Sequence, residues 1–359
     1  MKKILILLII VAGIMSCENK ENEFPDFDAQ AVYFPYQYPV RTIILGESRS
    51  DNSIDLDHAF SVGVAIGGMY KNTQDRIVDI ALDTTLLDSV AHGGGFPADT
   101  NYITAMPDNY YTATFNQITI PSGSFSGKMR VDLTDAFFED TLSAENTYVF
   151  PLAILPTTED SVLTGKAYEG LPSINIHNED HWETGKAPKH FTLFMVKFIN
   201  EFHGAYFNKG MDMRFDSVDA PLVSVPVGDT AATTNYSTRF LVENRFVNLT
   251  TRSLTESYLT RFGEQDEGGN YKMKLTFDPS SQDIVIDSVP GFVGVFGTGS
   301  YLDADDAGAL QWGGKPYRTL FLDYVYRDGN DRIHHVMDTL VYRDNAVVFE
   351  EFDIAPLGY

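Results

Sequence analysis

The chain contains one cysteine, Cys17, among 359 residues, so no disulfide can form within it. Lys and Arg number 26 against 50 Asp and Glu, and the formal net charge is -24. Because a chain with this charge repels phosphate groups, nucleic acid is excluded as a partner, and so is electrostatic adhesion to anionic lipid. Stability must come from core packing, which the 43% of hydrophobic residues in a chain of this length can supply.

A convincing helical period with caps is also missing from the sequence. Apolar and polar residues alternate instead, as in half-buried strands, and 25 Phe and 19 Tyr favour strands further. In the first half, turn clusters such as Pro107-Asp108-Asn109 separate the expected strands. These strands are residues 60–66, 117–120, 128–133 and 148–154. The pattern predicts an all-β sandwich, immunoglobulin-like in size or somewhat larger.

The second half shows longer alternating segments. Strands are expected at residues 192–198, 239–242, 271–277, 283–287, 318–326, 333–342 and 346–349. The Asp-Gly pair within residues 327–332 is a strong hairpin signal between two of them. Successive hairpins predict an antiparallel meander, either a barrel of the lipocalin type or a second sandwich.

Five segments follow from these patterns. They are a signal peptide at residues 1–16, a tether at 17–27, an N-terminal β-sandwich at 28–177, a linker at 178–190 and a C-terminal antiparallel β domain at 191–359. The linker is polar and contains Gly and Pro, with apolar strands on both sides. Trp182 within it is expected to pack between the two domains.

The first sixteen residues have the layout of a secretion signal. Lys2 and Lys3 precede an apolar run from Ile4 to Ala12, and a small residue, Ser16, stands directly before Cys17. The run is too short for a comfortable membrane span, which needs about 20 apolar residues. Its removal would leave 24 Lys and Arg against 50 acids, a net charge of -26.

Residues 14–17, Ile-Met-Ser-Cys, resemble the lipobox of bacterial lipoproteins, in which the cysteine is acylated and becomes the new N-terminus. The resemblance implies lipidation of Cys17, with palmitate among the expected acyl groups. The acidic stretch Glu18–Glu23 resembles the export signal that places Bacteroidetes lipoproteins on the outer face of the outer membrane. It implies a cell-surface protein that meets the membrane through its lipid anchor alone, with a periplasm-facing anchor as the alternative.

Residues 31–47, AVYFPYQYPVRTIILGE, resemble the start of the N-terminal β domain of surface lipoproteins from Bacteroidetes polysaccharide-utilisation loci. Further matches are Ile66–Tyr70, Ile120–Gly123 and Tyr148–Leu152, and residues 202–210 resemble the C-terminal β domain often attached to it. The resemblance implies a glycan-capture system that works beside an outer-membrane importer and its lipoprotein lid. In some relatives the first domain is fused to an endo-glycosidase, but this chain has no room for a catalytic barrel.

The residues themselves give no catalytic motif, and the 50 acids make any chosen carboxylate pair uninformative for two-carboxylate hydrolysis. No catalytic residue and no cofactor are therefore predicted. Asp303, Asp305 and Asp306 faintly resemble a calcium loop, but the bidentate Glu of the twelve-residue loop is missing, which favours a solvated turn.

Carbohydrate recognition requires flat aromatic faces together with polar groups for the hydroxyls. Trp312 is the best candidate, because it stands with Gln311 and Tyr317 in a loop that carries Gly and Pro. The alternative is that Trp312 closes one end of the β domain.

A recurrent Asp-Ser/Thr pair followed by an apolar residue or Thr resembles the O-glycosylation acceptor of exported Bacteroidetes proteins. Exposed loops favour Thr230 first, with Thr141 and Ser161 as further candidates and Thr339 last, although Asp-Ser and Asp-Thr are also common in turns.

Three functions remain open from the sequence. The leading one is a non-catalytic surface lipoprotein that binds an oligo- or polysaccharide. The others are a small β-sandwich glycosidase or lyase, and a structural subunit of an outer-membrane import complex.

Overall fold

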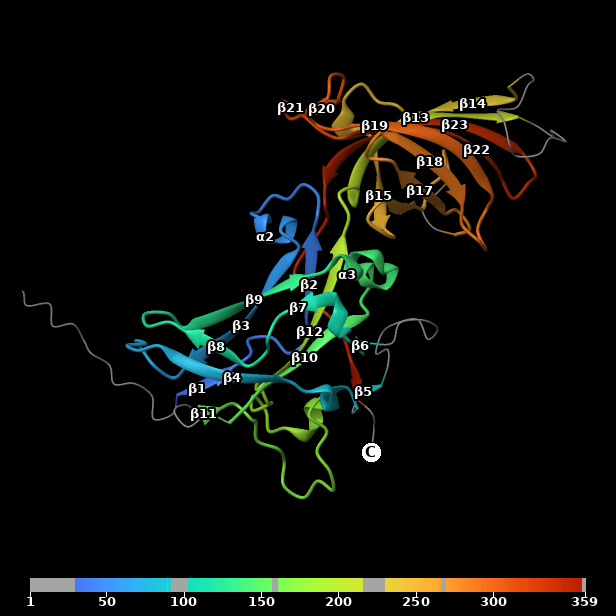
Figure 1. Ribbon diagram of the computed structural model, residues 1–359. Helices are drawn as coiled ribbons and strands as arrows, with labels where there is room; N and C mark the ends of the chain where they lie inside the picture. Colours follow the sequence, from blue (N-terminus) through green and yellow to red (C-terminus); the bar gives the residue numbers. More distant parts are fainter. Residues whose placement is uncertain are drawn as a thin grey trace, which may run out of the picture.

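The computed structural model describes residues 30–88, 90–91, 103–156, 161–215, 230–265 and 269–356. Strands dominate them, in an N-terminal sandwich followed by a C-terminal barrel (Figure 1). The predicted all-β, two-domain fold is confirmed. None of the described helices has the length and apolar character needed to cross a membrane.

The sandwich is built from two sheets. One has the order β11-β1-β3-β9-β7, and the other has the order β24-β2-β12-β10-β4-β8 with β6 beside β10. The strands are β1 (Ala31–Tyr33), β2 (Pro39–Ile44), β3 (Ala59–Gly67), β4 (Arg76–Leu82), β6 (Thr104–Ala105), β7 (Tyr111–Thr112), β8 (Gln117–Ile120), β9 (Ser126–Leu133), β10 (Tyr148–Ile154), β11 (Ser161–Val162), β12 (Phe191–Ile199) and β24 (Glu350–Glu351). A separate small pairing joins β5 (Val90–Ala91) to β25 (Ala355–Pro356).

Short helical turns connect these strands. They are α2 (Ser53–Leu56), η1 (Thr84–Leu87), η2 (Asp108–Tyr110), α3 (Asp135–Glu139), η3 (Thr141–Ala144) and η4 (Glu179–His181), with η5 (Leu241–Glu243) in the second domain. Asp83, Asp140 and Asn178 each accept a hydrogen bond from a backbone N–H at the start of such a turn. Such short polar side chains satisfy backbone donors that the turn leaves unpaired.

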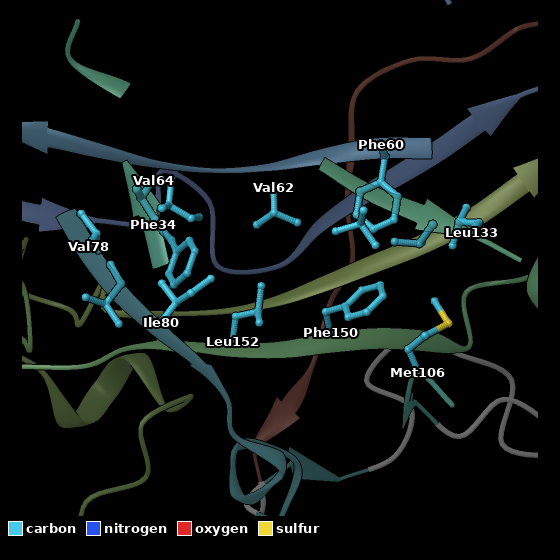
Figure 2. Packing of buried hydrophobic residues seen from close by; sticks show 14 of the residues in the cluster. Phe34, Phe60, Val62, Val64, Val78, Ile80, Met106, Leu133, Phe150 and Leu152 are labelled. Atoms are coloured by element: carbon cyan, nitrogen blue, oxygen red, sulfur yellow. The ribbon is translucent and has the colours of Figure 1, made fainter. Parts of the chain in front are cut away.

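The main core of the sandwich lies between its two sheets. The alternating residues Phe60, Val62 and Val64 of β3 point toward Phe150 and Leu152 of β10 (Figure 2). All five side chains are fully buried. The period-two pattern of residues 60–66 therefore has the predicted consequence, one apolar face directed into the core.

The second sheet is buried on its other face too. Val149 of β10 and Phe191, Leu193 and Met195 of β12 form a separate cluster with Phe352, which follows β24. This explains why residues 148–154 are almost continuously apolar, since a strand covered on both faces needs no polar side.

The predicted domain boundary is wrong at residues 178–199. Strand β12 lies in the sandwich, where it pairs antiparallel with β10 and parallel with β2. Its burial on both faces holds it there, so the C-terminal domain begins after residue 199. The predicted linker packs on the sandwich as well, because Lys189 N donates to Leu163 O at 2.7 Å. Trp182 forms a β-bridge with Ala167 and does not pack between the domains.

The second domain is a closed barrel, which decides between the two predicted architectures. Eight strands follow one another in the order β13-β15-β16-β17-β18-β19-β22-β23, and β13 also pairs with β23. They are β13 (Gly204–Phe215), β15 (Arg245–Thr251), β16 (Glu256–Leu259), β17 (Met273–Phe277), β18 (Asp283–Ser288), β19 (Val295–Leu302), β22 (Thr319–Arg327) and β23 (Ile333–Asp344). Strand β14 (Ala232–Asn235) pairs with residues 211–214 of β13, beyond the part of β13 that pairs with β15.

Closure depends on a glycine at the start of β13. Gly204 has a φ of 140°, and a Cβ there would lie 2.3 Å from the carbonyl oxygen of Asp344. Only glycine allows the two backbones to approach this closely. The predicted β22–β23 hairpin is confirmed, and its turn is held by Asp328, whose Oδ1 accepts from the backbone N–H groups of Asn330 and Arg332.

Buried polar residues fill part of the barrel interior. Asp338 accepts hydrogen bonds from Asn208, Tyr236 and Tyr324, and burial raises the pKa of its carboxyl group, although these donors oppose the shift. Nearby, Nδ1 of His334 lies 2.7 Å from Oδ1 of Asp212. Phe262 joins the apolar core, and the adjacent Gly263 donates through its backbone N–H to Tyr324. The network therefore fixes the β16–β17 connection across the barrel interior.

Two predicted strands are absent. Residues 239–242 form a turn around Asn244, whose side chain accepts from Thr238 N and donates to the carbonyl groups of Phe240 and Leu241. Residues 346–349 contain no strand because Asp344 and Asn345 accept from the backbone N–H groups two residues ahead. Such local hydrogen bonds replace those of a sheet.

Candidate functional site

Two chain segments connect the sandwich to the barrel, and a third lies beside them. Residues 200–203 run from β12 to β13, and residues 345–349 return from β23 to β24 (Figure 1). The loop after β2 contacts the end of β12 and the second connection. Leu45 N donates to Ile199 O at 3.1 Å, while the Tyr342 hydroxyl and the Asn345 side chain both donate to Glu47 O.

Arg318 fixes this joint from the barrel side. Its guanidinium donates to the carbonyl oxygen of Glu201 at 2.5 Å and to the Glu201 carboxylate at 2.6 Å. It also donates to Asp303 at 2.7 Å and lies 4.6 Å from the Phe202 ring centroid. Because Glu201 belongs to the first connection, this cation holds the end of the barrel against the chain that leaves the sandwich.

Two cavities open beside the joint, with volumes of about 500 and 370 Å³. Ser48, Arg49, Asp344 and Asn345 line both of them. Arg49 and Asp344 form an ion pair of 3.1 Å where the two cavities meet. We call the pair of cavities the junction groove. Its walls come from three segments, residues 40–50, 312–317 and 342–349.

The smaller cavity is lined by Trp312 and Tyr317, two of the predicted saccharide contacts. They stand on a hairpin of β20 (Gln311–Trp312) and β21 (Lys315–Pro316). Gly313 and Gly314 form its two-residue turn, with φ values of 57° and 80°. Positive φ at both central positions is what a tight hairpin turn requires, so the Trp-Gly-Gly-Lys sequence explains this local structure.

The ring of Trp312 has a fixed orientation. It stacks on Tyr317 with centroids 4.6 Å apart and planes inclined by 16°, and it meets the edge of Phe207 at 5.5 Å. Its Nε1–H donates to the carbonyl oxygen of Tyr342 at 3.0 Å. The indole remains partly exposed, so it neither fills the barrel core nor extends freely into solvent. Gln311 is exposed and does not line the groove.

In the acidic loop after β19, the carboxylates of Asp303 and Asp306 accept hydrogen bonds from other groups of the protein. Asp303 binds Arg318, and Asp306 accepts from Gln282 at 2.7 Å and from Asp303 N at 2.8 Å. These two hydrogen bonds lower the pKa of Asp306. Asp305 is exposed. The described part of the chain contains no group of three His, Cys, Asp or Glu residues placed to hold a metal ion. The geometry of this loop is therefore that of an internally bonded turn.

The predicted modification sites differ in accessibility. Thr230 and Ser161 are exposed, whereas Thr141 is partly buried at the start of η3. Thr339 is paired with Lys209 and Phe321 inside β23. Cys17, the signal peptide and the tether lie outside the described residues.

No sequence motif marks the charged side chains of the groove. The fold alone brings Arg49, Arg343 and Asp344 to the cavity that Trp312 lines, and none of the three belongs to a recognisable motif. Of the charged residues, only Lys315 could be placed from the sequence, because a two-residue turn puts it opposite Trp312. The polar residues inside the barrel were also missed, although Asn208, Asp212, His334 and Asp338 occupy alternating, inward positions of their strands.

Known proteins match both domains. Residues 26–161 match a family model described as a "-like, N-terminal domain", and residues 201–346 match the domain of unknown function DUF5627. The chain is similar to a Bacteroides ovatus protein of unknown function whose crystal structure superposes with a TM-score of 0.74. That protein shares 29% sequence identity with it, and the match covers 92% of this chain and 100% of the other.

Two more Bacteroides ovatus crystal structures resemble the chain weakly, each at 14% identity and a TM-score of 0.42. One is a protein of unknown function, matched over 90% of this chain and 100% of its own. The other is a multidomain protein that includes DUF1735, matched over 89% and 97%. No curated protein matches significantly. The two domain matches and the structure with the TM-score of 0.74 support the predicted relationship to Bacteroidetes proteins of unknown function.

Proposed function

We propose that this protein is a non-catalytic saccharide-binding lipoprotein of the cell surface, and that the junction groove is its binding site. The observation that carries the proposal is the Trp312–Tyr317 stack in the wall of a cavity of about 370 Å³. Anchoring through Cys17 and work beside an outer-membrane importer belong to the proposal through the sequence resemblance alone.

The stack has the properties of a sugar platform. A large aromatic ring gains affinity by covering the apolar side of a pyranose, and a ring already held in place loses little side-chain entropy on binding. The hydrogen bond from Trp312 to Tyr342 and the contact with Phe207 hold the indole in this way. Ser48, Asn345 and the charged residues of the groove supply polar partners for hydroxyl groups.

Binding without turnover fits the carboxylates of the groove. Glycoside hydrolysis uses two carboxyl groups, one on each side of the scissile bond. Among the described residues that line the groove, the carboxylates are Glu47 and Asp344. Asp344 is engaged by Arg49 at 3.1 Å and lies 3.7 Å from Arg343. Asp344 is held between these two arginines, so we assign it a binding role.

A glycan array, followed by affinity electrophoresis on the glycans that bind, tests the proposal. Trp312→Ala should weaken retention by about two- to tenfold, the range of one aromatic pair. Trp312→Phe should lose less, because a ring remains beside Tyr317. Phe296→Ala is the matched control, since it removes an exposed barrel ring outside the groove and should leave retention unchanged.

Three results would contradict the proposal. One is the absence of any retained glycan. Another is equal retention by Trp312→Ala and the wild-type protein. The third is the release of new reducing ends from a bound glycan, which would make the protein a glycosidase. Melting temperatures measured on the same samples separate loss of binding from loss of fold.

A further inference from the structure

The charge of the junction groove is opposite to that of the chain. Four basic residues line it, Arg41, Arg49, Lys315 and Arg343, against two acidic ones, Glu47 and Asp344. In the whole sequence acids outnumber bases by 50 to 26. The surface of such a protein repels anions in general, so a cavity with a basic excess selects the sign of what enters it.

The four cations are not equally engaged. Arg41 is paired with the buried Asp55, which neutralises it. Arg49 and Arg343 share one carboxylate, Asp344, and the Arg49 side chain remains 81% exposed. Two guanidinium groups with a single shared acceptor have hydrogen-bond donors to spare for a second anion.

Lys315 makes no ion pair with any residue that the structure describes. In the hairpin it is the direct cross-strand partner of Trp312. Side chains at paired strand positions lie about 5 Å apart at their Cβ atoms. The Lys315 side chain therefore starts beside the aromatic platform, and its length brings the ammonium group within reach of a substituent on a stacked sugar ring.

We propose that the groove takes an acidic saccharide, a chain containing uronic acid whose carboxylate is bound by Lys315, Arg343 and Arg49 while its ring stacks on Trp312. This inference rests on the proposed function and specifies its ligand. Arginine suits the task because its planar guanidinium binds a carboxylate through two parallel hydrogen bonds. The carboxylate of the saccharide is then a second acceptor, beside Asp344, for the hydrogen bonds of these arginines.

Affinity electrophoresis with two matched pairs of polysaccharides tests the ligand class. The pairs are polygalacturonate with its methyl ester, and chondroitin with its carboxyl-reduced form. Each pair keeps the sugar backbone and removes the charge. The acidic member should be retained about tenfold more tightly in at least one pair, the value expected for a hydrogen bond to a charged group. Non-specific attraction cannot produce this result, because the protein itself is strongly acidic.

Variants then locate the effect. Lys315→Gln should reduce retention of the acidic member about two- to fivefold and leave the neutral member unchanged. Lys315→Arg should restore it. Lys128→Gln removes the same charge from an exposed position of β9 that lines none of these cavities, and it should behave as the wild-type protein does.

The outcomes separate this inference from the proposed function. Equal retention of both members in both pairs, or retention of neutral glycans alone on the array, overturns the acidic ligand and leaves saccharide binding intact. Loss of acidic binding in Lys128→Gln as large as in Lys315→Gln also overturns it. If the array retains no glycan at all, both proposals fail together.

Discussion

Arg318 and Glu201 are bonded twice, through the Glu201 carbonyl oxygen at 2.5 Å and its carboxylate at 2.6 Å. Arg318 directly precedes β22 in the barrel, and Glu201 belongs to the segment that leaves the sandwich. The contact therefore sets how the groove-forming segments of the two domains meet.

Arg318→Gln should destabilise the protein by about 1–3 kcal/mol. This free-energy change lies between the values typical of an exposed and of a buried ion pair. The reason is that Arg318 is largely buried, whereas Glu201 and Asp303 are partly exposed. Urea unfolding followed by fluorescence measures the change. Arg327→Gln, which removes an exposed pair with Asp331 in the same barrel, is the control and should cost at most about 0.5 kcal/mol. Equal losses in both variants would show that Arg318 has no special role at the joint.

His203 should make the protein less stable as the pH falls from about 6.5 to 4. Burial lowers the pKa of His203 to about 4, and Lys197 acts in the same direction. Between about pH 6.5 and 4 the unfolded chain therefore binds a proton at this histidine, whereas the folded chain does not. The stability that His203 contributes above pH 6.5 is lost as the pH falls through this range. The full effect is about 3 kcal/mol. In addition, Nδ1 of His203 accepts a hydrogen bond from Thr251 N at 3.1 Å, and protonation of this nitrogen would remove the acceptor.

Urea unfolding at several pH values, compared between wild type and His203→Gln, measures this contribution. The glutamine oxygen can still accept from Thr251, but the side chain does not titrate. The difference in free energy of unfolding should change between pH 6.5 and 4 and stay constant above pH 7. Parallel curves throughout this range would contradict the assignment.

Cys17→Ala should abolish lipidation and leave either uncleaved precursor or soluble protein. The acyl groups attach to the cysteine sulfur, and the chain offers no second cysteine. Metabolic labelling with a fatty-acid analogue in a Bacteroidetes host measures the modification. Ser16→Ala retains a small residue before the cysteine and should still be labelled. Label that persists in Cys17→Ala would disprove the anchor.

O-glycosylation should occur at a minority of the Asp-Ser/Thr sites, with Thr230 first. Thr230 is exposed, whereas Thr339 lies within a paired barrel strand where a transferase cannot reach its hydroxyl. Intact mass of the protein from its native membrane, compared with Thr230→Ala, measures the modification. A wild-type mass equal to the lipidated polypeptide alone would show that these sites are ordinary turns.

Local patterns in the sequence were sufficient for the fold class and for much of the secondary structure. Residues 117–120 and 148–154 are strands with the expected bounds, and Asp328-Gly329 forms the predicted hairpin turn. Alternation and turn residues act over a few positions, so they can be recognised without knowledge of partners. The Trp-Gly-Gly-Lys hairpin is encoded in the same local way.

The partners of each strand were decided by the tertiary structure. Alternation tells which residues share a face, but not which sheet receives that face, so β12 was assigned to the wrong domain. Closure of the barrel depends on β13 meeting β23, more than 100 residues away in sequence. For the same reason the groove was invisible beforehand, since Arg49, Trp312 and Asp344 are brought together by long-range packing that no local motif records.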